Sequence, residues 1–160
     1  HKWMFQTKTI VEHCGFGFRH LGIWHNPQRK AGGNPGMWPF SYEAVLDFTK
    51  NGFRKLNNGN SVGHCDVWIE APTHETNHPA QKPIKFWTYL LELCTDSKEN
   101  VYEPFCGSGS TLIACEKTNR KCFGMEIDPV YIDVIVSRWC KFTGQTQIKN
   151  NGQDITWVIP

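Results

Sequence analysis

The second half of the chain has a regular pattern of apolar positions, which begins just after Pro83. Four apolar residues follow this proline at spacings of three, four and three: Ile84, Trp87, Leu91 and Cys94. Such spacing places them on one face of a helix. Proline is well suited to the first turn of a helix because it lacks a backbone N–H. The pattern therefore predicts a helix that begins near Pro83.

A strand, a glycine-rich turn, a helix, a second strand and a second helix follow directly. We expect a strand through Val101-Tyr102, a turn over 105–110, a helix from Thr111 to about Thr118, a strand over 122–126 and a helix ending near Phe142. The last helix would begin at an Asp128 cap with Pro129 in its first turn, and end at Gly144. Its expected apolar face contains Val130, Val134, Ile135 and Trp139. This order is typical of an α/β protein with a doubly wound parallel sheet.

The first half of the chain is less regular and contains long polar stretches. A strand is predicted over Phe18–Trp24 and a brief extended piece over 67–69. The apolar segment Tyr42–Thr49 is short, and its pattern does not distinguish helix from strand. Three segments rich in turn-forming or polar residues read as loops or turns: 27–39, 57–60 and 71–82.

Length and composition fit one packed domain outside the membrane. The chain has 160 residues, of which 39% are hydrophobic. We expect a single domain with a basic, loop-rich part (1–77), a more regular part (78–145) and a C-terminal tail or strand (146–160). No apolar run approaches the roughly 20 residues of a membrane span, so we predict a soluble, cytoplasmic protein without a membrane partner.

The cysteines favour reduced thiols. Seven are present, an odd number, and no two form a CxxC pair. The dipeptides His13-Cys14 and His64-Cys65 lack the paired short spacing of structural zinc sites. We therefore predict no metal site.

Candidate chemistry lies in the glycine-rich turn and in an acid after the next strand. A glycine turn between strand and helix lets a ligand approach the backbone and aims helix N–H groups at it. Glu126 lies 17 residues after Gly109, where an acid can hold the hydroxyls of a ribose. Glu103, before the turn, would repel a pyrophosphate and favour a cationic group, such as the ammonium of S-adenosylmethionine. Leu112 replaces the third glycine of the dinucleotide fingerprint.

The segment EPFCGSGSTLIACEKTNRKCFGMEIDPVYIDVIVSRWCKFTG closely resembles the cofactor region of DNA amino-methyltransferases, which make N6-methyladenine or N4-methylcytosine. HPAQKP at 78–83 resembles the family's other cofactor motif, and its place ahead of the glycine turn is similar to the beta-type motif order. The resemblance is specific over residues 78–144, and it implies that the 78–145 part binds the cofactor. It implies a three-layer, Rossmann-like α/β fold, incomplete in this chain, with S-adenosylmethionine as cofactor and double-stranded DNA as partner.

The resemblance also assigns cofactor contacts by position. The turn would line the cofactor through Phe105, Cys106, Gly107, Ser108 and Gly109, with Glu103 near the amino group. Glu126 would hold the ribose and Ile127 would touch the adenine. His78, Gln81, Lys82 and Pro83 would close the site from the other side. Glu in place of Asp at 103 and Ser in place of Thr at 110 are mild departures.

The family's catalytic motif, an acidic or polar residue followed by Pro-Pro and an aromatic, does not occur in this chain. Asp128-Pro129-Val130-Tyr131 imitates it, but this segment matches the family's region after the ribose acid. A complete methyltransferase sheet and its helices need about 180 residues. Together with the first residue, which is not Met, this predicts a C-terminal fragment without catalytic residues, inactive alone and complemented by an N-terminal segment or a homodimer partner.

Three other functions stay open: a catalytically silent S-adenosylmethionine-binding subunit, a nicotinamide-dependent oxidoreductase, and a DNA-binding module without cofactor. Residues 1–60 carry eight Lys and Arg but three acids. Arg29, Lys30, Arg54 and Lys55 are candidates for phosphate contacts, although a solvated surface explains them equally well. The residues present do not distinguish adenine from cytosine as the target.

Overall fold

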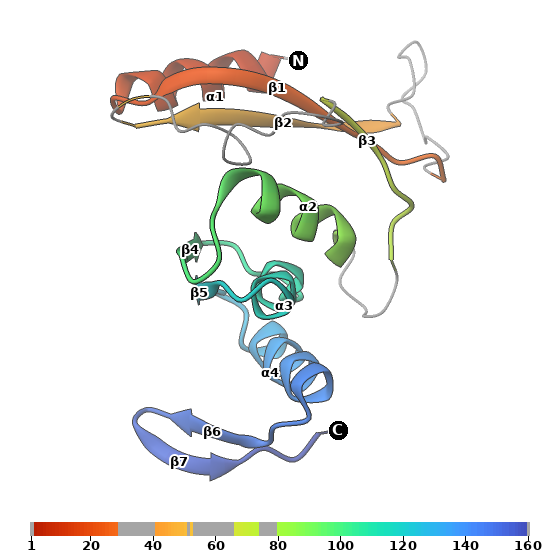
Figure 1. Cartoon of the computed structure of the whole chain (residues 1–160), viewed down its shortest axis with the longest axis vertical. Helices are drawn as coiled ribbons and strands as arrows, with labels where there is room; N and C mark the ends of the chain where they lie inside the picture. The colour runs from red at the N-terminus through yellow and green to blue at the C-terminus, as the bar shows by residue number, and fades with distance from the viewer. Residues whose placement is uncertain (1, 29–40, 51, 53–65, 74–79, 160) are drawn as a thin grey trace. The chain divides into compact units, whose positions relative to one another are not determined.

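The computed structural model describes residues 2–28, 41–50, 52, 66–73 and 80–159. The chain divides into two compact units, His1–Pro72 and Thr73–Pro160, coloured red to yellow and green to blue in Figure 1. Five of the predicted site residues lie outside the described residues: Arg29, Lys30, Arg54, Lys55 and His78. The single methyltransferase domain stays a prediction.

The first unit contains a helix and a three-stranded sheet (Figure 1). Helix α1 spans Lys2–His13 and strand β1 spans Gly17–His25. The sheet order is β2-β1-β3, with β2 (Tyr42–Thr49) antiparallel to β1 and β3 (Val67–Ile69) parallel to it. The predicted strand at 18–24 is confirmed. The ambiguous segment 42–49 is a strand because it pairs with β1 along its whole length.

Two tryptophans shape this sheet. The Trp24 side chain is 3% exposed, and its Nε1 donates to the Glu70 carbonyl oxygen at 3.0 Å. A Cβ on Gly22 would lie 2.4 Å from the Trp68 ring. A glycine is therefore required where β1 passes under that ring.

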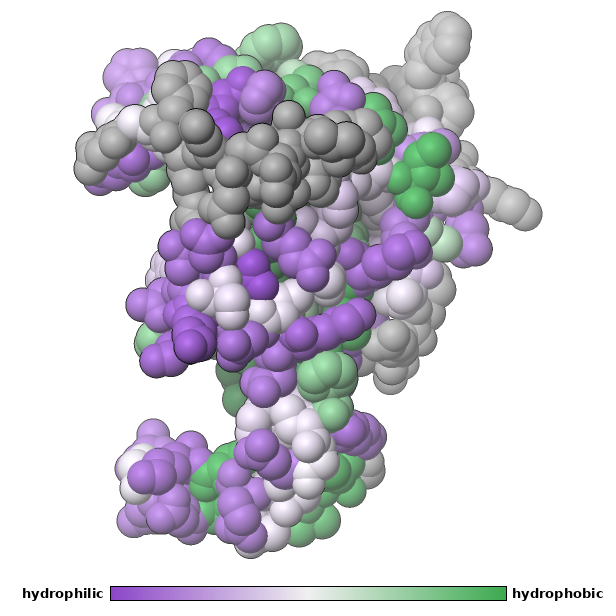
Figure 2. Space-filling model, in the orientation of Figure 1, coloured by the Kyte–Doolittle hydropathy of each residue, from purple (hydrophilic) through white to green (hydrophobic). Residues whose placement is uncertain are grey.

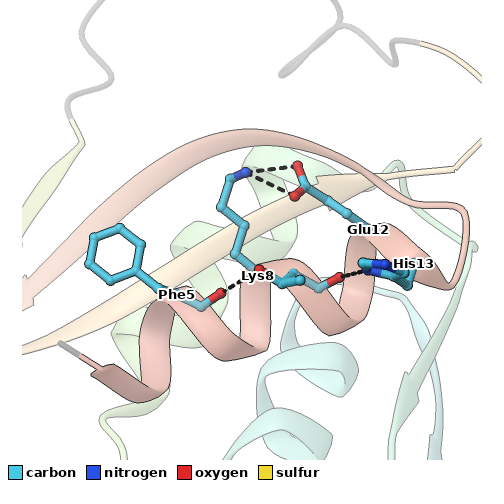
Figure 3. Close-up of polar contacts among 5 residues, drawn as sticks. Phe5, Lys8, Glu12 and His13 are labelled. Carbon is cyan, nitrogen blue, oxygen red and sulfur yellow. Dashed lines mark hydrogen bonds and ion pairs between the residues drawn. The ribbon is translucent and has the colours of Figure 1, made fainter.

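Helix α1 was not predicted from the sequence, and local polar contacts stabilise it (Figure 3). Lys8 Nζ contacts both carboxylate oxygens of Glu12 at 2.9 Å, and Thr9 Oγ1 donates to the Phe5 carbonyl oxygen at 3.0 Å. Lys8 also lies 5.2 Å from the centroid of the Phe18 ring on β1. Trp3, Phe5 and Ile10 are exposed, so the apolar residues of this helix do not all lie on one buried face.

The second unit has the predicted order of elements. It contains α2 (Ile84–Cys94), β4 (Asn100–Glu103), α3 (Ser110–Lys117), β5 (Lys121–Gly124), α4 (Pro129–Thr143), β6 (Gln147–Asn150) and β7 (Gln153–Thr156). Strands β4 and β5 are parallel, with Val101 opposite Cys122 and Glu103 opposite Gly124. The C-terminal part, expected as a tail or strand, is a β6–β7 hairpin. Figure 2 shows apolar colour where this hairpin adjoins α4.

The core of the second unit joins α2, α3 and one face of the β4–β5 sheet. Leu91, Ala114 and Cys115 form its buried centre, and Val101 and Cys122 pack against them from the strands. Tyr102 and Phe123, whose positions alternate with these, are 66% and 56% exposed. The alternation follows from the period of two along a strand.

Two boundaries differ from the predicted ones. Strand β5 ends at Gly124, so Glu126 lies in the following loop rather than at the strand end. Val130 is 66% exposed, whereas we expected it on the apolar face of α4. The buried residues of α4 are Ile135, Ser137 and Cys140. Val130 lies in the first turn of α4, away from the part that meets α3.

Replacement of Asp128 by alanine should lower the free energy of unfolding by about 1 kcal/mol. The Asp128 side chain caps α4 by accepting a hydrogen bond from the Val130 N–H at 2.9 Å. Urea denaturation followed by circular dichroism measures the change. D128N keeps a side-chain oxygen at the cap and serves as the matched control. Equal stability of D128A and the unmodified chain would contradict this role.

Candidate cofactor-binding site

The glycine-rich turn links the end of β4 to the start of α3. Gly107 and Gly109 have φ angles of 54° and 79°, in the left-handed region that favours glycine. The Gly109 N–H donates to the Cys106 carbonyl oxygen at 2.8 Å and closes the turn. A Cβ on Gly109 would lie 3.1 Å from the Ile135 side chain of α4. Both backbone angle and space therefore require glycine at 109.

Glu103 connects the two ends of this turn. One carboxylate oxygen accepts from the Phe105 N–H at 3.0 Å, and the other accepts from the Thr111 hydroxyl at 2.9 Å. A carboxylate offers about four lone-pair positions. Glu103 can therefore hold the turn and still accept hydrogen bonds from a cationic ligand group.

Glu126 lies on the other side of the turn. Its Oε2 accepts from the Gly107 N–H at 2.7 Å, and its Oε1 accepts from the N–H groups of Ile127 and Asp128 at 2.9 and 3.0 Å. These bonds fix the carboxylate beside the turn. Two carboxylates, separated by 23 residues in sequence, thus flank one glycine loop.

A pocket of about 430 Å³ lies in front of the turn. Eight residues predicted to contact the cofactor line it: Gln81, Lys82, Glu103, Phe105, Cys106, Gly107, Ser108 and Glu126. Three others do not. Gly109 faces Ile135 of α4, Pro83 is fully buried at the start of α2, and Ile127 is 98% exposed outside the pocket. The individual cofactor contacts stay predictions.

The pocket also has four lining residues that were not predicted: Ala80, Trp87, Ser110 and Thr111. Trp87 lies one turn into α2 after Pro83, and Thr111 lies one residue into α3. The sequence contains a weak signal for Thr111, because a hydroxyl soon after the turn can reach the acid before it. For Trp87, its place on an apolar stripe indicated core packing instead.

The residues present fit a ligand with polar groups. Ser110 begins α3, and its hydroxyl is buried without a hydrogen-bond partner among the described residues. Buried hydroxyls are usually paired, so an orphan beside a pocket indicates a ligand partner. The two carboxylates can accept from an ammonium and from ribose hydroxyls. This donor and acceptor set fits S-adenosylmethionine, the cofactor expected from the sequence.

Cys106 is a neutral thiol at the edge of this pocket. Hydrogen bonding with the Cys122 thiol, then burial and the carboxylates of Glu103 and Glu126, raise the pKa of Cys106 well above its usual range. Hydrogen bonding with Cys106 lowers the pKa of Cys122, but hydrogen bonding with Cys115 and burial outweigh it and raise that pKa to about 12. A Cβ on Gly124 would lie 2.3 Å from Cys106 Sγ. The thiol therefore fills the space that glycine leaves beside β5.

Other functional groupings are absent from the part of the chain that the structure describes. No cluster of three or more His, Cys, Asp or Glu side chains there could hold a metal ion. In the same residues, no helix has the length and apolar character needed to cross a bilayer.

Solved structures with a similar fold include a DNA methyltransferase. The M1.HpyAVI complex with SAM matches with a TM-score of 0.75 and 21% identity, over 86% of this chain and 70% of that chain. The cytosine-N4-specific PvuII DNA methyltransferase matches with a TM-score of 0.74 and 17% identity, over 90% of this chain and 61% of that chain. These matches confirm the predicted class, an α/β methyltransferase fold.

The family itself follows from the sequence match. A family model described as DNA methylase, for N6 and N4 methyltransferases, matches residues 4–137. The chain belongs to this DNA methylase family, which confirms the resemblance drawn from the motifs.

The curated relatives are type II methyltransferases. M.HpaI of Haemophilus parainfluenzae is 29% identical over 152 residues, which cover 82% of this chain and 48% of that protein. M.HindIII of Haemophilus influenzae is 38% identical over 93 residues, 51% of this chain and 30% of that protein. The chain thus spans about half, or less, of the curated relatives it matches.

Proposed function

We propose that this chain is the cofactor-binding part of a DNA methyltransferase that methylates the exocyclic amine of adenine (N6) or cytosine (N4). One observation carries the proposal: Glu103 and Glu126 flank a glycine turn and line the same pocket, in a chain of the DNA methylase family. The names of the type II relatives support a place in restriction-modification. We further place the protein in the cytoplasm, with double-stranded DNA as its partner.

The residues of the pocket would divide the work of binding. When bound, S-adenosylmethionine supplies a methyl group on an electron-poor sulfonium. Glu103 is the acceptor for its ammonium group, and Glu126 is the acceptor for its ribose hydroxyls. The half-buried Trp87 and the exposed Phe105 offer apolar surface at the pocket. Holding the reactive group at a defined place is the main contribution such residues make to the rate.

The amine to be methylated needs a motif that this sequence does not contain. An acceptor that orients the amine, and an aromatic that stacks on a flipped base, are required for attack on the methyl group. No Pro-Pro-aromatic motif occurs in the sequence. We therefore propose that another segment, joined to this chain, supplied by a complementing polypeptide or contributed in a homodimer, carries the catalytic residues. Arg29, Lys30, Arg54 and Lys55 remain proposed DNA contacts.

The missing motif also favours a second function, that of a catalytically silent S-adenosylmethionine-binding subunit. The coding sequence upstream of His1 distinguishes the two. An acidic or polar residue followed by Pro-Pro and an aromatic there supports the enzyme. A start codon directly before the His1 codon supports the subunit.

The chain by itself should bind S-adenosylmethionine but transfer no methyl group to DNA, because it lacks the motif that orients the amine. The test is incubation with methyl-labelled cofactor and double-stranded DNA, followed by counting of label in the DNA. A complete type II methyltransferase is the positive control for transfer, and calorimetric titration with S-adenosylhomocysteine checks binding. Robust labelling of DNA by the chain alone would refute the fragment proposal.

A further inference from the structure

Helix α4 supports the glycine turn at two points. Arg138 Nη1 donates to the Ser108 carbonyl oxygen at 2.5 Å and lies 3.2 Å from the Ser108 hydroxyl. Ile135 lies one helical turn earlier and packs against Gly109. Residues three apart share one face of a helix. One face of α4 therefore holds two consecutive residues of the turn.

The turn needs such support because its own backbone is permissive. Ser108 lies between Gly107 and Gly109, both in left-handed conformations. Glycine adopts many other backbone angles at little cost. A hydrogen bond from a guanidinium to a carbonyl is stronger than a bond between neutral groups. Arg138 therefore restricts the backbone of Ser108, which its two flanking glycines restrict little.

The side of the turn that faces the pocket is held by other groups than the side that faces α4. Glu126 holds the Gly107 N–H, but the same carboxylate is proposed to bind the ribose. Arg138 does not line the pocket, so cofactor binding does not compete for its guanidinium. The hydrogen bond from Arg138 to Ser108 thus remains when Glu103 and Glu126 turn from the backbone to the cofactor.

Helix α4 is itself anchored independently of the turn. The Trp157 Nε1 donates to the Ser137 hydroxyl at 3.0 Å, and the Trp139 Nε1 donates to Glu116 at 3.1 Å. These contacts come from the segment after β7 and from α3. The position of Arg138 is thus defined by contacts outside the pocket.

We propose that Arg138 is a positioning residue for cofactor binding, which sets the conformation of the glycine turn from behind through Ser108. This inference rests on the proposed function, since it assigns a role within the same cofactor site.

The test compares R138M with R120M. Arg120 also donates to backbone carbonyls, those of Thr95 at 2.7 Å and Thr118 at 2.6 Å. It precedes β5, whereas the turn follows β4, so the two arginines lie at opposite ends of the parallel strands. R120M is therefore a matched loss of an arginine with backbone contacts, away from the pocket.

Calorimetric titration with S-adenosylhomocysteine should show that R138M weakens binding about tenfold, the effect of one lost charge-assisted hydrogen bond. R120M should leave the dissociation constant within about twofold. Thermal unfolding without ligand measures the stability of both variants. R138K, which keeps a cationic donor, should recover part of the lost affinity. If R138M does not fold, R138Q replaces it with the same expected direction.

Three results would contradict the proposed function or the role of Arg138, and each can be distinguished from the other two. An unmodified chain that folds but does not bind S-adenosylhomocysteine contradicts the proposed function and, with it, this inference. Binding by the unmodified chain and equal binding by R138M overturns the role of Arg138 alone. Parallel losses of affinity in R138M and R120M, in step with their stability, also overturn it, because they indicate a structural role only.

Discussion

Replacement of Glu126 by glutamine is expected to weaken binding of S-adenosylhomocysteine about a hundredfold. The carboxylate accepts from the Gly107 N–H with one oxygen and from the Ile127 and Asp128 N–H groups with the other. A glutamine amide has one acceptor oxygen, so its NH₂ group must face a backbone donor on one side. The ribose also loses its acceptor. Hydrogen bonds to charged groups are worth about 1.5–3 kcal/mol each, which corresponds to roughly a hundredfold in affinity.

The control for E126Q is D154N. Asp154 lies on β7 with an 80% exposed side chain, where it pairs only loosely with Lys149 at 4.0 Å. D154N makes the same change of charge away from the pocket and should leave affinity unchanged. Isothermal titration calorimetry measures both variants. Equal affinities for E126Q and the unmodified chain would remove Glu126 from the binding site.

Replacement of Gly109 by alanine should lower the free energy of unfolding by about 2–5 kcal/mol. A left-handed φ costs an alanine about 1–2 kcal/mol, and crowding in a packed site adds about 1–3 kcal/mol. The crowding comes from Ile135, whose atoms would lie 3.1–3.4 Å from the new Cβ. Isoleucine is stiff about its first side-chain bond, so it cannot easily move aside.

Gly144, which follows α4, separates the two costs. Its φ is 73°, close to that of Gly109, but a Cβ there would meet nothing within 4 Å. G144A should therefore cost only about 1–2 kcal/mol, the backbone part of the penalty. Denaturant unfolding of the two variants gives the difference directly. Equal losses would show that Ile135 does not restrict position 109.

The elements around the cofactor site were predictable because their signals are local. Pro83 and the stripe after it indicated α2, and Asp128, Pro129 and Gly144 marked both ends of α4. Strand–turn–helix order then indicated the parallel pair β4–β5. Each of these signals depends on residues within a few positions of one another, so one sequence contains them completely.

What was missed depends on contacts between distant residues. Tyr42–Thr49 became a strand through pairing with β1, which no local pattern could decide. Arg138 contacts Ser108 across 30 residues of sequence, and nothing in the surrounding segment distinguishes it from a surface arginine. Trp87 looked like a core residue, although it also lines the pocket. These roles depend on packing between segments that are distant in sequence, which the periodicity of apolar residues does not reveal.

The close approach of Cys106 and Gly124 couples the side chains that these two positions can hold. The two positions share one volume, since a Cβ at 124 would lie 2.3 Å from the thiol. A methyl group at 124 is compatible with the fold where position 106 is smaller or where the Cys106 thiol turns to another rotamer. The glycine turn and strand β5 therefore constrain each other's side chains at this point.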